Sequence, residues 1–240
     1  MIGALVATLP ISAGPSYVFL ALDHDAAFIA QGALASLPIN AVTIFFATAY
    51  VLMAQRNSML ASLSSALAVW LALAVLVRMT DWTLAGGIMV NLIAFAICLP
   101  LVRRLRAAKM PLITRRWYDI PLRAALVATL VATVVTLSNS VGPTVSGILA
   151  LFPVVFASLM LILQPRIGGP ATAAVIANGL WGLIGFGVAV MVLRLAARSF
   201  GAAAALSLAL ATSIGWNLGL WALGRYRVAR AAASRPSSPS

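Results

Sequence analysis

The chain has 240 residues, of which 63% are hydrophobic and 8% charged, and its formal net charge is +12. This composition excludes an ordinary soluble domain and predicts a protein whose solvent is the lipid bilayer. A spanning helix needs about 20 mostly apolar residues, so the chain has room for roughly eight helices and no sizeable soluble domain. The arginines stand at the ends of apolar runs, where they orient a membrane protein, and no nucleic-acid partner is expected.

The first half of the sequence predicts four spanning helices, at residues 2–22, 26–53, 59–77 and 82–102. Pro10 and the pair Gly14-Pro15 interrupt the first one, so a kinked or two-piece helix is expected there. Asp23-His24-Asp25 is the only cluster with metal-ligand chemistry. Adjacent residues rarely converge on one ion, which favours a solvated turn. Cys98 is the only cysteine, so a disulfide within the chain is excluded.

A basic connection, residues 103–121, leads to the second half. Four more helices are expected there, at residues 124–137, 143–163, 171–193 and 200–223, with a turn at 164–170. The tail from 225 to 240 ends in serines and prolines that cannot bury apolar surface, so it is expected to be disordered in the cytoplasm. The predicted fold class is an all-α polytopic membrane protein with two parallel four-helix repeats, residues 1–102 and 122–224.

Three features recur in the same order and indicate an internal duplication. Ala-Leu-Val-Ala-Thr-Leu occupies residues 4–9 and 125–130, and a Gly-Pro pair follows each copy. Then comes a Gly-x-Leu-Ala sequence with a proline six residues after the glycine; we call residues 32–38 and 147–153 the repeated segments. An even number of helices per half makes the repeats parallel, related by an axis along the membrane normal. The helices that contain the repeated segments are expected near this axis.

The basic residues predict the orientation of the helices. With a cytoplasmic N-terminus, thirteen of the sixteen Lys and Arg residues lie on the cytoplasmic side and three, Arg78, Arg194 and Arg198, lie opposite. The positive-inside rule therefore places both termini in the cytoplasm. Six residues of the connection are expected to orient the protein and contact anionic lipids, at about 1 kcal/mol each at most: Arg103, Arg104, Arg106, Lys109, Arg115 and Arg116.

The candidate site residues lie at mid-membrane. A proline leaves the carbonyl four residues before it without a helical donor, so Pro38 and Pro153 are expected to free the oxygens of Leu34 and Leu149 for an ion or a solute. The simpler interpretation is a kink that neighbouring helices satisfy. Small residues spaced four apart beside the prolines favour close helix packing: Gly32 with Ser36, and Ser146 with Ala150.

Five amides fall inside the expected helices: Gln31, Asn40, Asn91, Asn178 and Asn217. An amide in hydrocarbon needs a partner or water, so these are expected to face the interior, where they bond helices together or line a path. Asn178 lies three residues before Trp181 on a glycine-rich face that favours close packing. The hypothetical substrate path consists of Leu34, Pro38, Asn40, Leu149, Pro153, Asn178 and Trp181.

No enzyme activity, cofactor or metal is expected. The chain has no glutamate, none of its four aspartates lies deep in an apolar run, and no phosphate loop or nucleophile elbow occurs. Duplicated halves with matched kinks predict a secondary transporter or exporter of a small molecule or ion, and Na⁺ suits non-titrating amides better than H⁺. A non-transporting scaffold or accessory subunit and a passive channel are the alternatives. The expected partners are the lipid bilayer and the solute. The sequence leaves the choice between a monomer and a homodimer undecided.

Residues 147–163, with Phe152-Pro153 at mid-helix, and the glycine-rich helix after them resemble the GlpM family of small, uncharacterised bacterial membrane proteins. Those proteins are similar to one half of this chain, and the resemblance covers the second half. The first half departs from it, with Leu37 before Pro38 and the Asp-His-Asp insertion. The resemblance implies a multi-pass protein of the bacterial inner membrane and brings no established substrate or catalytic residues.

Overall fold

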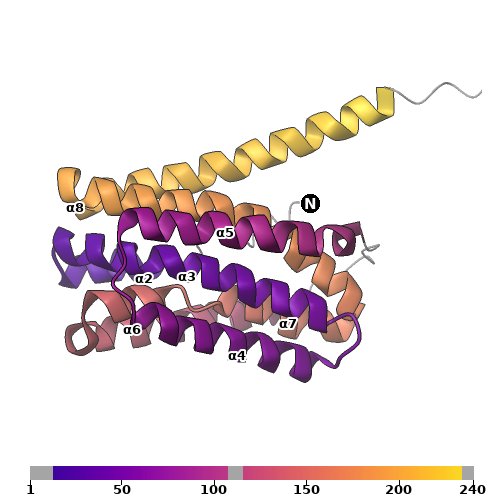
Figure 1. Cartoon of the computed structure of the whole chain (residues 1–240), viewed down its shortest axis with the longest axis horizontal. Helices are drawn as coiled ribbons and strands as arrows, with labels where there is room; N and C mark the ends of the chain where they lie inside the picture. Colours follow the sequence, from indigo (N-terminus) through magenta and orange to yellow (C-terminus); the bar gives the residue numbers. More distant parts are fainter. Residues whose placement is uncertain (1–12, 108–115, 234–240) are drawn as a thin grey trace, which may run out of the picture.

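The computed structural model describes residues 13–107 and 116–233. The elements are α2 (Ala13–Asp23), α3 (Ala26–Met53), α4 (Met59–Arg78), α5 (Leu84–Val102), the 3₁₀ helix η1 (Arg103–Ala107), α6 (Asp119–Ala150), α7 (Val154–Ile167) and α8 (Gly169–Ala233). Within these ranges, five stretches are long and apolar enough to cross a membrane. The described chain is all-helical and membrane-embedded, as its composition predicts (Figure 1).

α6 and α8 are each two helices joined at a glycine. A straight helix of the 65 residues of α8 would be roughly 100 Å long, far more than the hydrocarbon core of a bilayer. The backbone is non-helical at Gly142 (φ 74°) and at Gly201 (φ 81°), and the chain doubles back at both (Figure 1). Glycine adopts positive φ without the strain a side chain brings, so both reversals depend on it.

The helices of the first half begin where local capping starts them. The side chains of three N-cap residues accept a backbone N–H of the first turn: Asp25 from Phe28, Ser58 from Ala61 and Thr83 from Gly86. As a result α3, α4 and α5 lie within two residues of the predicted 26–53, 59–77 and 82–102. The part of the first predicted helix before Ala13, including Pro10, lies outside the described residues.

The helices of the second half are longer than predicted. α6 starts at Asp119, inside the connection expected at 103–121, and residues 225–233 of the supposedly disordered tail belong to α8. α7 continues to Ile167, so Gly168 (φ 81°) makes the turn expected at 164–170. These boundaries were wrong because a helix that emerges from the apolar region continues through polar residues until a glycine or a cap ends it.

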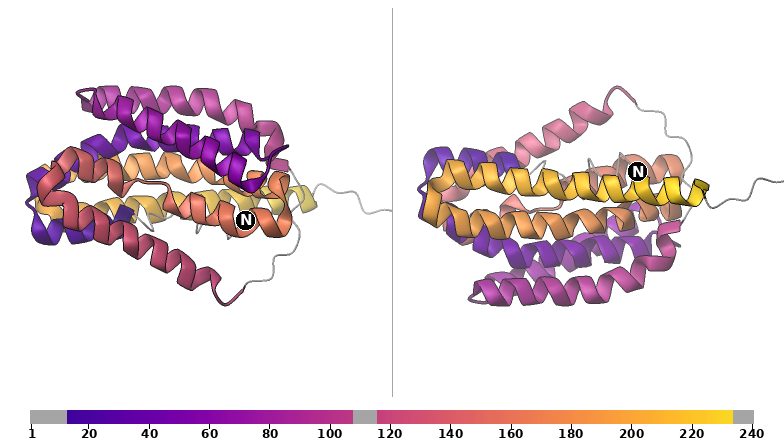
Figure 2. Two further views of the ribbon diagram at one scale, coloured as in Figure 1. Left: turned by 90° about the horizontal axis from the view of Figure 1, so that it is seen from below. Right: turned by 90° about the horizontal axis from the view of Figure 1, so that it is seen from above.

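α3 is the central helix of the bundle. It packs against α4, α5, α6 and α8, and Figure 2 shows it enclosed by the others in both views. Every residue from 35 to 44 is buried, including Pro38, which lies within the helix and does not interrupt it. A helix surrounded by others over its middle needs no polar face there, which explains why most of its sequence is apolar.

The two ends of the bundle differ in charge. One end holds the α3–α4 turn, η1, the start of α6, the α7–α8 turn and the last turns of α8 (Figure 1). We call it the basic end, because the described arginines Arg56, Arg103, Arg104, Arg106, Arg116, Arg123, Arg166 and Arg225 lie there. The opposite end carries Arg78, Arg194 and Arg198. Lys109 and Arg115 lie outside the described residues.

A bidentate salt bridge joins α6 to α7 at the basic end. Arg166 donates from its two terminal nitrogens to the Asp119 carboxylate, at 2.8 Å and 2.6 Å. This bidentate geometry fixes the orientation of both side chains. We expect Arg166→Gln to lower the thermal unfolding midpoint of the purified protein, because Asp119 loses both guanidinium donors and keeps only the backbone N–H of Arg116. Arg103→Gln, at an exposed position, should leave the midpoint unchanged. Equal midpoints for the two variants would contradict the role of the bridge.

Candidate functional site

The two repeated segments meet at the centre of the bundle. A methyl group built on Gly147 would overlap the carbonyl group of Gly32, and one built on Gly32 would lie 3.2 Å from the carbonyl oxygen of Pro143. The backbones of α3 and α6 are therefore in direct contact, which glycines permit. The predicted close packing is confirmed at Gly32, whose neighbour on α6 is Gly147.

The helix is interrupted within the second repeated segment. α6 ends at Ala150 and α7 begins at Val154, so three residues between them are not helical. The N–H of Phe152 turns back to the carbonyl oxygen of Leu149, at 2.9 Å. The prediction that Pro153 frees the Leu149 oxygen was wrong, because the chain tightens into a shorter hydrogen-bonded turn before the proline.

One carbonyl oxygen that loses its helical donor at this break is that of Gly147. The N–H of Leu151, its normal partner, points to Ile148 at 3.2 Å. The hydroxyl of Ser36 donates to the Gly147 oxygen at 2.8 Å, and the hydroxyl of Tyr17 lies 2.7 Å from the Ser36 oxygen. Since the Ser36 proton is already used, Tyr17 is the donor of the second bond. A buried chain of hydrogen bonds from α2 through α3 thus holds the broken helix.

An amide pair lies one helical turn further along α3. Asn40 is at the midpoint of the 28-residue helix; its Nδ2 donates to Asn91 Oδ1 on α5 at 2.8 Å and to the carbonyl oxygen of Leu183 on α8 at 3.1 Å. Asn91 Nδ2 donates to the carbonyl oxygens of Leu37 and Gly87, at 2.7 Å and 2.8 Å. The pair therefore joins three helices at mid-bundle.

The side-chain oxygen of Asn40 is enclosed and unpaired. Asn40 is completely buried, and its amide orientation is fixed because Asn91 Oδ1 and the Leu183 oxygen both require a donor. Among the described residues, nothing donates to the remaining oxygen. A buried acceptor without a partner costs about 1–3 kcal/mol, so a donor or a cation would be stabilised there. A methyl group at Gly187 would lie 2.9 Å from Asn40 Nδ2, so this glycine makes room for the pair.

Asn178 and Trp181 do not join this centre. Arg106 of η1 donates from Nε to Asn178 Oδ1 at 3.0 Å, and its guanidinium carbon lies 5.5 Å from the centre of the Trp181 ring. Asn178 Nδ2 donates to the carbonyl oxygens of Arg106 at 3.3 Å and Ala174 at 2.8 Å. Trp181 is 36% exposed. These residues bind η1 to α8 toward the basic end.

The other candidates divide between the core and the surface. Pro38 and Pro153 are buried, whereas Leu34 and Leu149 are half-buried. Gln31 is exposed, contrary to the prediction that every intramembrane amide faces the interior. Of the predicted path, Asn40 is therefore the residue that the structure leaves with an unused polar atom at the centre. Tyr17, Ser36 and Asn91 complete the centre, and the sequence did not assign them to the path.

His24 contributes a contact rather than a metal site. Its Nε2 lies 2.7 Å from the hydroxyl oxygen of Ser138 on α6, and its ring stacks on Phe28 with 3.7 Å between ring centres. Asp25 caps α3. The turn is thus more than a solvated loop, since it fastens α3 to α6. In the part of the chain that the structure describes, no three His, Cys or carboxylate side chains gather to hold a metal ion.

Comparison of the chain with known protein families, with curated proteins and with solved structures found no match. The resemblance to the GlpM family stays a prediction from the sequence. The functional conclusion rests on the geometry at the centre of the bundle.

Proposed function

We propose that the protein is a secondary transporter or exporter of a small solute, and that the solute or its coupling ion binds beside Asn40. The observation that carries the proposal is the enclosed, unpaired oxygen of Asn40 at mid-bundle. A polar atom left unused at this depth is expensive in a membrane protein and marks functional positions. The bacterial inner membrane is the proposed location, with the basic end in the cytoplasm because cytoplasmic ends collect arginines.

The proposed architecture is eight crossings in two parallel repeats. The reversals at Gly142 and Gly201 support it, since each divides a stretch too long for one crossing. The contact of Gly32 with Gly147 supports it further, because equivalent residues of parallel repeats meet at their common axis. The halves have diverged at this point: α3 is continuous through Pro38, whereas α6 and α7 are separated before Pro153.

The chemistry of the centre limits the class of ligand. An amide oxygen accepts a hydrogen bond or coordinates a cation, so the ligand carries a neutral donor group or is a small cation such as Na⁺. The four aspartates, Asp23, Asp25, Asp81 and Asp119, all lie at helix ends or in turns. With no carboxylate at the centre and amides that do not titrate, Na⁺-coupled or facilitated movement fits better than H⁺ coupling.

The broken helix supplies a hinge for access to this centre. In the described conformation the helices close around the amide pair, with Leu37 and Gly87 in contact beside it. The three residues between α6 and α7 are outside the α-helical hydrogen-bond pattern, and a side-chain bond from Ser36 holds the Gly147 oxygen near the end of α6. Movement of α7 relative to α6 would change how α7 packs against α8, the helix whose Leu183 oxygen bonds Asn40, without breaking a continuous helix.

The test is a screen of solutes and monovalent cations for thermal stabilisation of purified protein, with Asn40→Leu and Asn178→Leu as variants. A ligand at about 100 times its dissociation constant adds about 2.7 kcal/mol to the folded state. We expect this gain in stability in the parent and in Asn178→Leu but not in Asn40→Leu. Circular dichroism should show that all three proteins are folded. Solute uptake into proteoliposomes should likewise be present with the parent and with Asn178→Leu and absent with Asn40→Leu.

Three outcomes would change the proposal. Equal stabilisation of Asn40→Leu would place the ligand elsewhere. Flux that only follows the solute gradient and never accumulates solute would indicate a passive channel. A broad library without a hit, together with proteoliposomes that move no solute, would favour a scaffold or accessory subunit.

A further inference from the structure

One side of α3 carries polar or small residues through the centre of the bundle. Along the chain these residues are spaced four, three, four and three apart, which places them on one side of a helix: Ser36, Asn40, Thr43, Ala47 and Tyr50. We call these five positions the polar face of α3. None of the five is more than 6% exposed. The buried polar groups therefore extend beyond the amide pair, from Asn40 toward the basic end.

The hydrogens of the polar face are already used in hydrogen bonds. Ser36 donates to a carbonyl oxygen of α6 at 2.8 Å, and Thr43 donates to one of its own helix at 3.0 Å. Tyr50 donates to Gln164 Oε1 on α7 at 2.7 Å, and the Asn40 amide donates twice. Lone pairs remain: the unpaired Oδ1 of Asn40 and, because a hydroxyl oxygen has two lone pairs, the oxygens of Thr43 and Tyr50. A molecule bound here must donate hydrogen bonds or be a cation.

No charged side chain lies on the polar face or among its described hydrogen-bond partners. These partners are hydroxyl, amide and backbone carbonyl groups of the surrounding helices. A cation bound among them would bring its charge into the bundle without a carboxylate to balance it, which is costly at this depth. A neutral donor supplies the hydrogen bond that Asn40 Oδ1 lacks and brings no charge. The polar face therefore favours a neutral donor over a cation.

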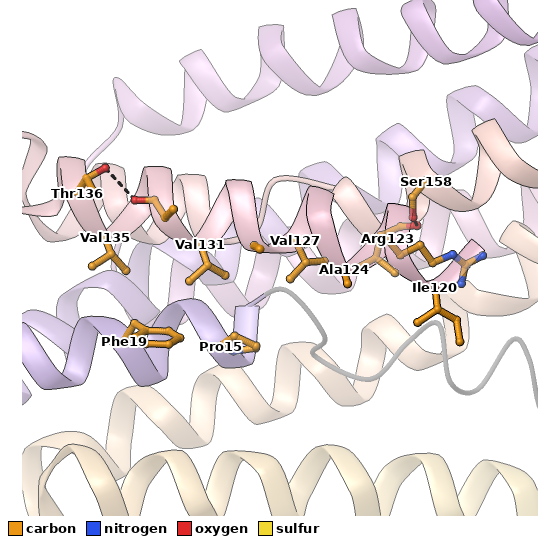
Figure 3. Close-up of a pocket in the computed structure, with 13 residues that line it drawn as sticks. Pro15, Phe19, Ile120, Arg123, Ala124, Val127, Val131, Val135, Thr136 and Ser158 are labelled. Carbon is orange, nitrogen blue, oxygen red and sulfur yellow. Dashed lines mark hydrogen bonds between the residues drawn. The ribbon is translucent and has the colours of Figure 1, made fainter. Parts of the chain in front are cut away.

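A groove between α2 and α6 has the opposite chemistry. Its volume is about 760 Å³, and valines and alanines line it over the middle of the first part of α6, with Pro15 and Phe19 of α2 opposite them (Figure 3). Such a wall offers no side-chain acceptor, so a polar molecule that left water for it would lose hydrogen bonds. Of these two features, the polar face of α3 is the one that can replace the hydrogen bonds of a polar solute to water.

We propose that the solute is uncharged and binds by donating hydrogen bonds, from hydroxyl or amide N–H groups, to Asn40 Oδ1 and to the hydroxyl oxygen of Thr43. Thr43 lies three residues after Asn40 on the same side of α3, so one small molecule with two donors can reach both oxygens. This ligand class rests on the proposed function, and it narrows the two classes that the Asn40 oxygen alone admits, a neutral donor and a cation.

The experiment measures the thermal unfolding midpoint of the purified full chain with two series of probes. The members of a series are similar in shape and differ in charge: acetamide, acetamidinium and acetate in the first, and ethylene glycol, ethanolammonium and glycolate in the second. Sodium chloride is the probe for a small cation, and the ionic strength is held constant. We expect acetamide and ethylene glycol, the neutral members, to stabilise the parent more than their charged analogues do.

Three variants show whether the polar face binds these probes. Asn40→Leu should lose the stabilisation by the neutral probes. Thr43→Val should weaken their apparent affinity about fivefold, because one hydrogen bond is lost. Thr133→Val is the matched control and should bind the probes as the parent does. It also removes a hydroxyl that donates to the carbonyl oxygen four residues earlier, but at an exposed position on α6.

Three results would contradict this ligand class, and they differ in what they leave standing. Equal or greater stabilisation by sodium or a charged analogue, lost in Asn40→Leu, would make the ligand an ion and leave the proposed transport intact. Equal affinities in Thr43→Val and Thr133→Val would exclude the polar face beyond Asn40. Stabilisation that persists in Asn40→Leu, or none by any probe, would remove Asn40 as the binding position and with it both proposals. Circular dichroism checks folding, and Thr43→Val decides if Asn40→Leu does not fold.

Discussion

Gly147→Ala is expected to destabilise the protein by about 3 kcal/mol or more, the largest effect of any single methyl group added to the centre. The added methyl would overlap the carbonyl group of Gly32, and this neighbour is backbone in the most buried helix of the bundle. α3 cannot move aside, because α4, α5 and α8 pack against its other faces. Thermal unfolding of the purified protein, followed by circular dichroism, measures the loss.

Gly215→Ala is the matched control for this substitution. Gly215 also lies within a helix, and a methyl group built on it meets nothing within 4 Å. Alanine is a better helix former than glycine by about 1 kcal/mol, so this variant should be as stable as the parent or slightly more so. Similar unfolding midpoints for the two variants would show that α3 and α6 are not in backbone contact.

Ser36→Ala is expected to cost about 2 kcal/mol, because it removes two hydrogen bonds and leaves two buried groups unpaired. The Gly147 oxygen loses its donor and the Tyr17 hydroxyl loses its acceptor. Tyr17→Phe removes one donor and leaves the bond between Ser36 and Gly147 intact, so it should cost under about 1 kcal/mol. The unfolding free energies of the two variants, measured under one condition, decide whether Ser36 stabilises the interruption between α6 and α7. A larger cost for Tyr17→Phe would contradict the proposed direction of the hydrogen bonds.

Helix positions in the first half were predictable because their determinants are local. Asp25, Ser58 and Thr83 each stand directly before an apolar run and cap it. In the second half the polar residues 138–140 and 164–166 were taken as helix ends, yet the helices pass through both. The backbone reverses at Gly142 and Gly168 instead, where φ is positive. Polarity shows which residues can meet water, but it does not determine where the helical backbone ends.

The centre was predictable only in part. Asn40 was singled out because an amide at mid-membrane needs a partner, but that partner, Asn91, lies 51 residues away on another helix. Asn178 fitted the same argument and is instead bound by Arg106, which the sequence placed among surface charges. Ser36 was read as a small packing residue, and its hydroxyl acquires a role only when α6 opens beside it. Pairings between distant helices depend on packing that the sequence alone does not specify.

The position of α3 also constrains how the chain is made. It is the second helix in the described sequence, yet its most extensive packing is with α8, which is synthesised last. Until α8 arrives, Asn40 has no Leu183 oxygen to bond and one side of α3 faces lipid or a chaperone. The helices before α6 are therefore not an independent folding unit. We therefore expect the bundle to close around α3 only when α8 has been inserted.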